Sequence, residues 1–293
     1  MNEMQLKIFI EAADCKSLTK AADHLFLSPP AVMNQVNSLE SDLGVKLFER
    51  SPRGILLTES GKSVYADAKL LLKNYEKLIQ NARRVAAQSP FVVRVGTSFL
   101  APCKELMDLW AEENDKFPQF KVEVIPFEYT NDTIIPILEH LGTDFDFIVS
   151  PCDSIHWKSI CNFYKLGDYE ISLAVPYTHP LSKKKQIVLE DLYGETLLMP
   201  KSDDSITMQR IRAEIEQFHT QIHLEQTVFY YDFHVFNQCA QRQCTMLTLT
   251  GWRDLHPSLK TIPIKWDYKM PYGILYPLKP SEDVIHFLDI MKK

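Results

Sequence analysis

Several features that would assign a protein to a class at once are missing from this chain of 293 residues. Its six cysteines form no CxxC pair and have no histidines at zinc-finger spacing, so we predict no structural zinc site, no other metal site and no cofactor. No apolar stretch approaches the ~20 residues that cross a bilayer, and the first residues lack a secretory signal pattern. The sequence therefore predicts a cytoplasmic protein with no membrane partner.

The motifs of common enzymes are missing as well. The sequence contains no GxSxG, no HExxH and no GxxxxGK, so we predict that the protein is not an enzyme and assign no catalytic residue. Cys239 and Cys244 leave two interpretations open. They are either a redox pair or free cysteines that serve as small buried apolar residues.

Charge is distributed unevenly along the chain. The formal net charge of −6 argues by itself against a nucleic-acid partner. Residues 1–90, however, hold 12 Lys and Arg against 10 Asp and Glu, whereas the remainder holds 20 against 28. The N-terminal part therefore has the positive net charge that favours DNA binding, and the remainder is acidic. The length of the chain allows two or more domains.

Three helical patterns follow one another in the first 43 residues. Apolar residues recur on one face of a first helix over residues 6–13, and a second helix is predicted over residues 18–26. A third begins at Ser28, whose hydroxyl can cap it, with two prolines in its first turn, and ends at Gly44. Two short helices joined by a tight turn form a helix-turn-helix, whose second helix enters the major groove of DNA.

The third helix carries an apolar stripe through Val32, Val36, Leu39 and Leu43, which leaves a polar face on the opposite side. Asn and Gln amides can pair with adenine, so this face has the means to read bases; the alternative is an ordinary solvated helix face. The candidate DNA-binding residues on this helix are Ser28, Pro30, Ala31, Asn34, Gln35, Asn37 and Ser38.

A short hairpin is predicted directly after this helix, with strands at residues 45–47 and 55–57. Arg50 and Arg53 lie on its turn, where guanidinium groups can bind phosphates without reading sequence. Such a hairpin is the wing of a winged helix-turn-helix.

The head resembles the LysR-type family of transcriptional regulators. The likeness rests on ADHLFLSPPAV at residues 22–32, LGVKLFER at residues 43–50 and RGILLTESG at residues 53–61. The family often has glutamine where this chain has Pro29. The resemblance implies a DNA-binding domain at residues 1–58 and RNA polymerase as a partner.

Residues 59–90 are predicted to form a linker helix of roughly 45 Å. Its apolar residues alternate spacings of four and three, which is typical of a seam against another helix, so we expect dimerisation. Packing against the chain's own body is the alternative. The candidate dimerisation residues are Val64, Ala68, Leu71, Tyr75, Leu78 and Ala82.

Beyond Pro90 strands and helices alternate, which predicts an α/β sandwich with a largely parallel sheet. The expected strands are residues 92–96, 122–127, 145–149, 171–175, 197–199, 226–230, 246–249 and 272–276. The expected helices are residues 102–117, 134–141, 205–218, 232–241 and a C-terminal helix around Val284 to Met291.

This body is similar to the LysR-type effector domain, through VRVGTS at residues 93–98, FDFIVSP at 145–151 and LAVPYTHPL at 173–181. The resemblance implies a two-lobed α/β domain like that of periplasmic binding proteins. The predicted fold is therefore multi-domain, with an all-α winged helix-turn-helix head, a long linker helix and a two-lobed effector domain at residues 91–293. Lobe I would hold about 91–164 and 266–293, and lobe II about 165–265.

Ligands of open α/β sheets bind beyond the carboxyl ends of the strands, near helix N-termini that favour anions. The candidate effector-binding residues are Thr97, Ser98, Phe99, Thr130, Ser150, Lys201, Ser202 and Thr250, each of which has an ordinary helix cap or strand end as its alternative role. Hydroxyls and one ammonium suit an anionic or polar metabolite.

The sequence thus predicts a LysR-type regulator that binds double-stranded DNA and is controlled by a small-molecule effector held between two lobes. We expect a homodimer, and the resemblance implies a homotetramer built as a dimer of dimers. The alternative is a DNA-binding architectural protein without ligand sensing.

Overall fold

The computed structural model describes residues 1–51, 54–201, 204–227, 232–253 and 255–292. The chain divides into two compact units, Met1–Ser89 and Pro90–Lys293, each with its own hydrophobic core. Across these described residues, no helix has both the length and the apolar character that a membrane span requires.

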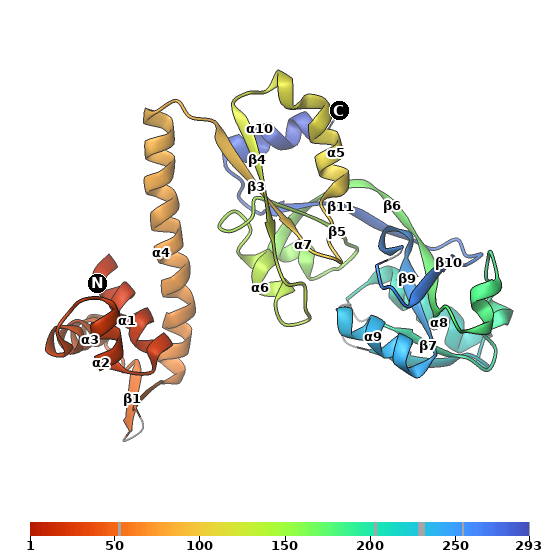
Figure 1. Cartoon of the computed structure of the whole chain (residues 1–293), viewed down its shortest axis with the longest axis horizontal. Coiled ribbons are helices and arrows are strands. Elements are labelled where there is room, and N and C mark those ends of the chain that lie inside the picture. Colours follow the sequence, from red (N-terminus) through yellow and green to blue (C-terminus); the bar gives the residue numbers. More distant parts are fainter. Residues whose placement is uncertain (52–53, 202–203, 228–231, 254, 293) are drawn as a thin grey trace. The chain divides into compact units, whose positions relative to one another are not determined.

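The first unit consists of four helices and a two-stranded hairpin (Figure 1). Its elements are α1 (Glu3–Cys15), α2 (Leu18–His24), α3 (Pro29–Leu43), β1 (Phe48–Ser51), β2 (Gly54–Leu57) and α4 (Glu59–Ala86). Helix α1 packs against α4 on one side and against α2 and α3 on the other, through a core that includes Phe9, Leu39 and Ala68. The three predicted N-terminal helices and the long fourth helix are therefore present.

Local hydrogen bonds explain where these helices begin and end. The Ser28 hydroxyl accepts from the Ala31 N–H at 3.4 Å, as the sequence predicted. Gly44 follows α3 with a φ of 70°, the left-handed conformation that glycine adopts without strain. Thr58 caps α4 by accepting from the Gly61 N–H at 2.8 Å and donates to the Lys46 carbonyl at 2.7 Å.

The wing differs from its prediction in one respect. Its first strand is Phe48–Ser51 and not residues 45–47. The reason is the carboxylate of Glu40, whose side chain is only 6% exposed. Its Oε1 accepts from the N–H groups of Leu47 at 2.8 Å and Phe48 at 3.3 Å, which draws the segment before the strand back against α3.

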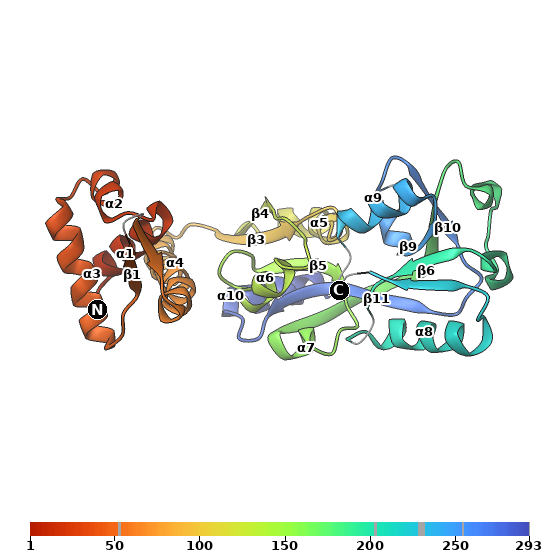
Figure 2. The same ribbon diagram turned by 90° about the horizontal axis from the view of Figure 1, so that it is seen from below.

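The second unit is built on a sheet of nine described strands, covered by helices on both faces (Figures 1 and 2). Its strands are β3 (Phe91–Thr97), β4 (Phe120–Pro126), β5 (Phe147–Pro151), β6 (Cys161–Pro176), β7 (Thr196–Met199), β8 (His223–Gln226), β9 (Thr245–Leu249), β10 (Leu259–Pro263) and β11 (Lys269–Pro277). Its α-helices are α5 (Lys104–Glu113), α6 (Ile134–Glu139), α7 (Trp157–Ile160), α8 (Ile206–Phe218), α9 (Phe233–Arg242) and α10 (Glu282–Met291). Short 3-10 helices cover Asn114–Lys116, Pro180–Lys183, Leu189–Leu192 and Thr250–Trp252.

The strand order is β4-β3-β5-β11-β6-β9-β7-β8, with β10 paired to β6. The outer strands of each lobe pair in parallel, but β6 and β11 pair antiparallel with each other and with their other neighbours. The expectation of a largely parallel sheet therefore holds only for the strands outside β6, β10 and β11. Both long strands pass from one lobe to the other, and they run in opposite directions (Figure 2).

Some element bounds in this unit also differ from the prediction. Strand β10 was not predicted, and the helix expected over residues 102–117 is shorter, at Lys104–Glu113. The strand expected at residues 226–230 is instead His223–Gln226, and its predicted last three residues lie outside the described part of the chain.

We expect Glu40→Gln to loosen the wing. At neutral pH the loss of a charged acceptor for two buried N–H groups should destabilise the segment by about 1–3 kcal/mol. Hydrogen exchange of residues 45–51, measured by mass spectrometry, should then be roughly 5- to 150-fold faster. The exposed Glu49→Gln, which removes the same charge, should change exchange little.

The effect of Glu40→Gln should also depend on pH. Burial by itself raises the pKa of the Glu40 carboxyl, but hydrogen bonds from Lys46, Leu47 and Phe48 outweigh it, and the pKa is lowered. A lowered pKa stabilises the fold above the unfolded value and loses that effect as pH falls through the folded value. The difference between wild type and variant should therefore shrink in acid, and a difference that persists or grows there would contradict this account.

Candidate functional site

Helix α3 has one face inside the head and one face outside it. Val32, Val36 and Leu39 are fully or nearly fully buried in the core of the head, where α3 packs against α1 and α2. Of the predicted DNA-binding residues on the opposite side, five are exposed and two, Ala31 and Gln35, are half-buried. The exposed five are Ser28, Pro30, Asn34, Asn37 and Ser38.

Two of these polar residues also hold the helix in place. Ser28 is its N-cap, and the Ser38 hydroxyl accepts from the Gln5 side-chain amide at 3.0 Å. Arg50 lies on β1, on the hairpin that follows α3, although the structure does not describe its side chain. Arg53 lies outside the described residues.

The sequence interpretation missed two residues beside this surface. Phe26, in the turn between α2 and α3, is 96% exposed and has a φ of 55°. Lys46, just before the wing, forms an ion pair with Glu40 at 2.5 Å and remains 75% exposed. The sequence could have indicated Phe26, because it lies outside the apolar faces of the helices that form the core. An aromatic residue at such a position is a candidate for exposure.

The predicted dimerisation stripe on α4 has two parts. Ala68 is buried in the core of the head and Val64 packs against it, so these two residues serve the chain's own fold. Leu71, Tyr75 and Leu78 are 44–64% exposed, and Ala82 is exposed as well. Leu71, Tyr75 and Leu78 line a largely apolar groove of about 390 Å³ that the N-terminal end of α1 completes.

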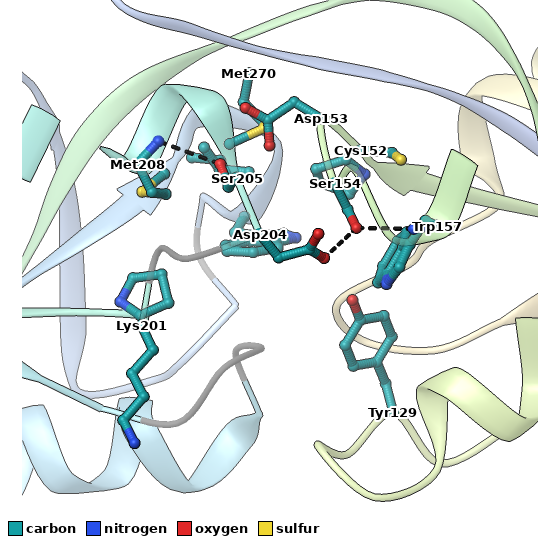
Figure 3. A pocket seen from close by; sticks show the side chains of 14 residues that line it. Tyr129, Cys152, Asp153, Ser154, Trp157, Lys201, Asp204, Ser205, Met208 and Met270 are labelled. Atoms are coloured by element: carbon teal, nitrogen blue, oxygen red, sulfur yellow. Dashed lines mark hydrogen bonds between the residues drawn. The ribbon is translucent and has the colours of Figure 1, made fainter. Parts of the chain in front are cut away.

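A pocket of about 90 Å³ in the second unit lies beyond the carboxyl ends of β5, β7 and β9 (Figure 3). This is where the rule for open α/β sheets expects a ligand. Tyr129, Asp153 and Trp157 line it from lobe I, and Lys201 and Asp204 line it from lobe II. Figure 3 shows that the Lys201 side chain extends away from Asp204.

Asp204 joins the two sides of this pocket. One of its oxygens accepts from the Ser154 hydroxyl (Figure 3), and the other accepts from the His156 N–H at 2.8 Å. Its backbone carbonyl accepts from the Ile155 N–H at 3.0 Å. We call residues 153–156 together with Asp204 and Ser205 the interlobe latch.

A carboxylate of the protein also lies at the N-terminus of α8. The Thr207 N–H donates to Asp153 at 2.8 Å, and the Met208 N–H donates to the Ser205 hydroxyl at 3.2 Å. Helix N-termini attract anions because their N–H groups lack partners within the helix. Here Asp153, from the other lobe, supplies the anion.

A second, larger hollow of about 610 Å³ lies beyond β3 and β4, at the N-terminus of α9. Ser98, Phe99 and Thr130, all predicted effector-binding residues, line it together with Phe233. The Phe99 and Phe233 ring centroids lie 5.7 Å apart, so aromatic contact links the lobes here. Tyr129 lines both hollows, and the sequence interpretation did not select it.

The remaining predicted effector residues are placed differently. Thr97 ends β3 and does not line either hollow, among the residues described. The Ser150 side chain is buried and donates to the Pro151 carbonyl at 3.2 Å. The Thr250 hydroxyl accepts from the Glu170 N–H at 3.1 Å, and Ser202 lies outside the described residues.

Cys239 and Cys244 meet at the end of α9. The Cys239 thiol donates to the Cys244 carbonyl at 3.1 Å, and the Cys244 N–H donates to the Cys239 carbonyl at 3.3 Å. Gln243 between them has a φ of 53°, as in helix endings that bring these two positions together. The contacts show a role in ending the helix, and a redox role stays a hypothesis.

Comparison with known proteins identifies the protein family to which this chain is similar. A family model described as bacterial regulatory helix-turn-helix protein, lysR family, matches residues 4–62. The chain is 30% identical over 210 residues to the uncharacterized HTH-type transcriptional regulator YoaU of Bacillus subtilis (strain 168), covering 71% of this chain and 69% of YoaU. It is 28% identical over 200 residues to YvbU of the same organism, covering 68% of this chain and 66% of YvbU.

Solved structures show the same fold over the whole length. CbnR, a LysR family transcriptional regulator, matches with a TM-score of 0.75 at 19% identity, covering 100% of this chain and 98% of CbnR. Full-length CbnR complexed with its target DNA matches with a TM-score of 0.73 at 20% identity, covering 100% of this chain and 99% of CbnR. The helix-turn-helix head and the two-lobed α/β body are therefore those of a LysR-type regulator. The chain belongs to the LysR family of transcriptional regulators, and not to a family of enzymes.

We expect Asp204→Ala to open the interlobe latch. The variant removes the acceptor for the Ser154 hydroxyl and the His156 N–H, and hydrogen bonds to charged groups contribute about 1.5–3 kcal/mol each. Hydrogen exchange of residues 154–157 should therefore be at least roughly tenfold faster than in wild type. Asp267→Ala, which removes an exposed acid elsewhere in the same unit, should leave this exchange unchanged. Equal exchange in both variants would show that Asp204 does not hold the segment.

Proposed function

We propose that this LysR-type regulator binds double-stranded DNA with α3 in the major groove and the wing on the phosphates. The observation that carries the proposal is the two-sided character of α3. Its apolar side is anchored in the core, which leaves Asn34 and Asn37 exposed on the opposite side. Amide side chains on such a surface can form paired hydrogen bonds with adenine. The solved complex of CbnR with its target DNA supports the proposal.

We further propose that two copies associate through α4. The exposed Leu71, Tyr75 and Leu78 continue the four-three spacing of a helix seam beyond the part that packs on the head. A second copy is the occupant that fits, because the same stripe on both partners satisfies two-fold symmetry. Paired heads would contact two half-sites and double the phosphate contacts of a weakly basic domain. Assembly of two such dimers, and contact with RNA polymerase in the cytoplasm, complete the proposed arrangement.

The proposed effector is a polar small molecule bound beyond β5, β7 and β9. Asp153 and Asp204 bring two carboxylates to the wall of this pocket and Lys201 brings one ammonium, which favours polar groups that donate hydrogen bonds over a multiply charged anion. The effector would act by competing with or reinforcing the interlobe latch, which shifts the population of closed lobes. A protein without ligand sensing is the alternative.

We expect substitutions on α3 and on the wing to change DNA binding in two different ways. Asn34→Ala should change base preference at one position by about 1–3 kcal/mol, because it removes a candidate base contact. Arg53→Ala should weaken binding to specific and random DNA alike and reduce the salt slope by about one. Fluorescence anisotropy on both kinds of DNA over a range of salt separates the two outcomes.

Gln217→Ala, on the exposed surface of α8, is the matched control and should bind as wild type does. If Asn34→Ala loses the same affinity for specific and for random DNA, Asn34 does not read bases. If neither variant changes binding, α3 and the wing are not the DNA-binding surface.

The α4 seam predicts that Leu78→Glu dissociates the dimer. Leu78 is 64% exposed within one chain, so the variant should fold, but a buried carboxylate without a partner would destabilise the dimer strongly. Analytical ultracentrifugation should show a Kd raised at least roughly a hundredfold. Gln80→Glu, on an exposed position of the same helix, should remain dimeric; a dimeric Leu78→Glu would place the interface elsewhere.

Effector control is tested by thermal unfolding with a panel of metabolites. A ligand that binds the native state raises the Tm with its saturation. Tyr129→Phe should reduce the shift produced by any ligand of either hollow, because Tyr129 lines both. If no compound shifts the Tm and DNA footprints are the same with every compound, the alternative without ligand sensing is correct.

A further inference from the structure

Three metal-ligating side chains of different types meet at the junction of α1 and α2. Glu11 and Cys15 lie one turn apart on α1, and His24 is the last residue of α2. The His24 Nδ1 lies 2.7 Å from Glu11 Oε1 and 3.5 Å from the Cys15 Sγ, and the Cys15 Sγ lies 3.3 Å from Glu11 Oε1. Each residue therefore directs its ligand atom to one point.

We propose that Glu11, Cys15 and His24 form a binding site for a divalent transition metal of the Zn²⁺ class. The ligands would be the carboxylate, the thiolate and the imidazole Nδ1, with water in the fourth position. A mixed oxygen, sulfur and nitrogen set favours Zn²⁺ and its neighbours over Mg²⁺ or Ca²⁺, which bind oxygen.

The distances suit a tetrahedral ion. With the usual bond lengths of Zn²⁺ to sulfur, nitrogen and oxygen, ligand atoms lie about 3.3–3.6 Å apart. The 3.5 Å between the Cys15 Sγ and the His24 Nδ1 already agrees, and the 3.3 Å between the Cys15 Sγ and the Glu11 Oε1 is short by roughly 0.2–0.3 Å. The hydrogen-bonded Glu11–His24 pair, at 2.7 Å, has to open most, by roughly 0.6 Å, when the ion replaces the shared proton.

Exposure and proton balance are compatible with uptake of an ion from solution. Glu11 and Cys15 are half-buried and His24 is exposed, which gives access and leaves room for a water ligand. The Cys15 thiol loses its proton when the Zn–S bond forms, and this partly exposed site lets the proton leave to solvent. Asp14 adds negative charge beside the site and Lys20 adds positive charge.

The position of the site connects it to both elements of the head that face DNA in the proposed function. The turn after Cys15 contacts the wing, because the Ile55 N–H donates to the Lys16 carbonyl at 3.2 Å. The segment after His24 leads within four residues to Ser28, the cap of α3. An ion would therefore join the end of α1 to the end of α2 beside the start of α3.

Cobalt is the probe that tests the site. The full chain, without a polyhistidine tag and freed of metal under reducing conditions, is titrated with Co²⁺. We expect saturation at one equivalent, a thiolate-to-cobalt charge-transfer band, the strong visible bands of tetrahedral cobalt, and displacement by Zn²⁺. Cys15→Ser should remove the charge-transfer band, and His24→Gln and Glu11→Gln should each weaken Co²⁺ binding at least roughly tenfold.

Matched variants separate this site from other thiols and imidazoles. Cys103→Ser places a good helix-capping residue at the N-cap of α5, where Cys103 makes no side-chain cap bond, and His223→Gln changes an exposed histidine. Both variants should bind Co²⁺ as wild type does. If circular dichroism shows that Cys15→Ser does not fold, the proposal is tested by His24→Gln, whose substituted side chain is exposed and whose Co²⁺ affinity should be reduced. A band that persists in Cys15→Ser, or a wild type without stoichiometric Co²⁺ binding, overturns the proposal. No DNA is involved, so the result is independent of the proposed function.

Discussion

The apolar anchorage of α3 and the carboxylate at its end fix the geometry of the head. Val32, Val36 and Leu39 hold the helix in the core, so its opposite face can only point outward. Glu40 then binds the N–H groups of Leu47 and Phe48, which sets where the wing begins relative to that face. The position of one helix thus sets both surfaces that the proposed function places on DNA, which is the preorganisation that such recognition requires.

The second unit combines parallel and antiparallel pairing for a physical reason. Two long strands, β6 and β11, must join lobes that each have a parallel sheet, and an antiparallel pair supplies two crossings side by side. The crossing brings the carboxyl ends of β5, β7 and β9 to a common pocket. Asp153 and Asp204 connect the lobes across that pocket, so the residues that hold the lobes together also line the proposed effector site.

Local patterns allowed much of this to be predicted. A serine followed by two prolines, and a glycine after the last apolar turn, gave the bounds of α3 correctly because caps are local interactions. The effector residues were less predictable. Ser98, Phe99, Thr130 and Lys201 do line hollows, whereas Ser150 is buried along its strand, because the sequence does not specify which lobe approaches which strand end.

The sequence by itself determined the LysR-type architecture, the cap and outer face of α3, and the long helix α4. These depend on periodicity, capping and motif order, which are properties of neighbouring residues. Only the tertiary structure decided that Glu40 holds the wing, that Asp153 lies at the N-terminus of α8, and that Glu11, Cys15 and His24 meet. These contacts join residues from different elements, and their distances depend on how those elements pack.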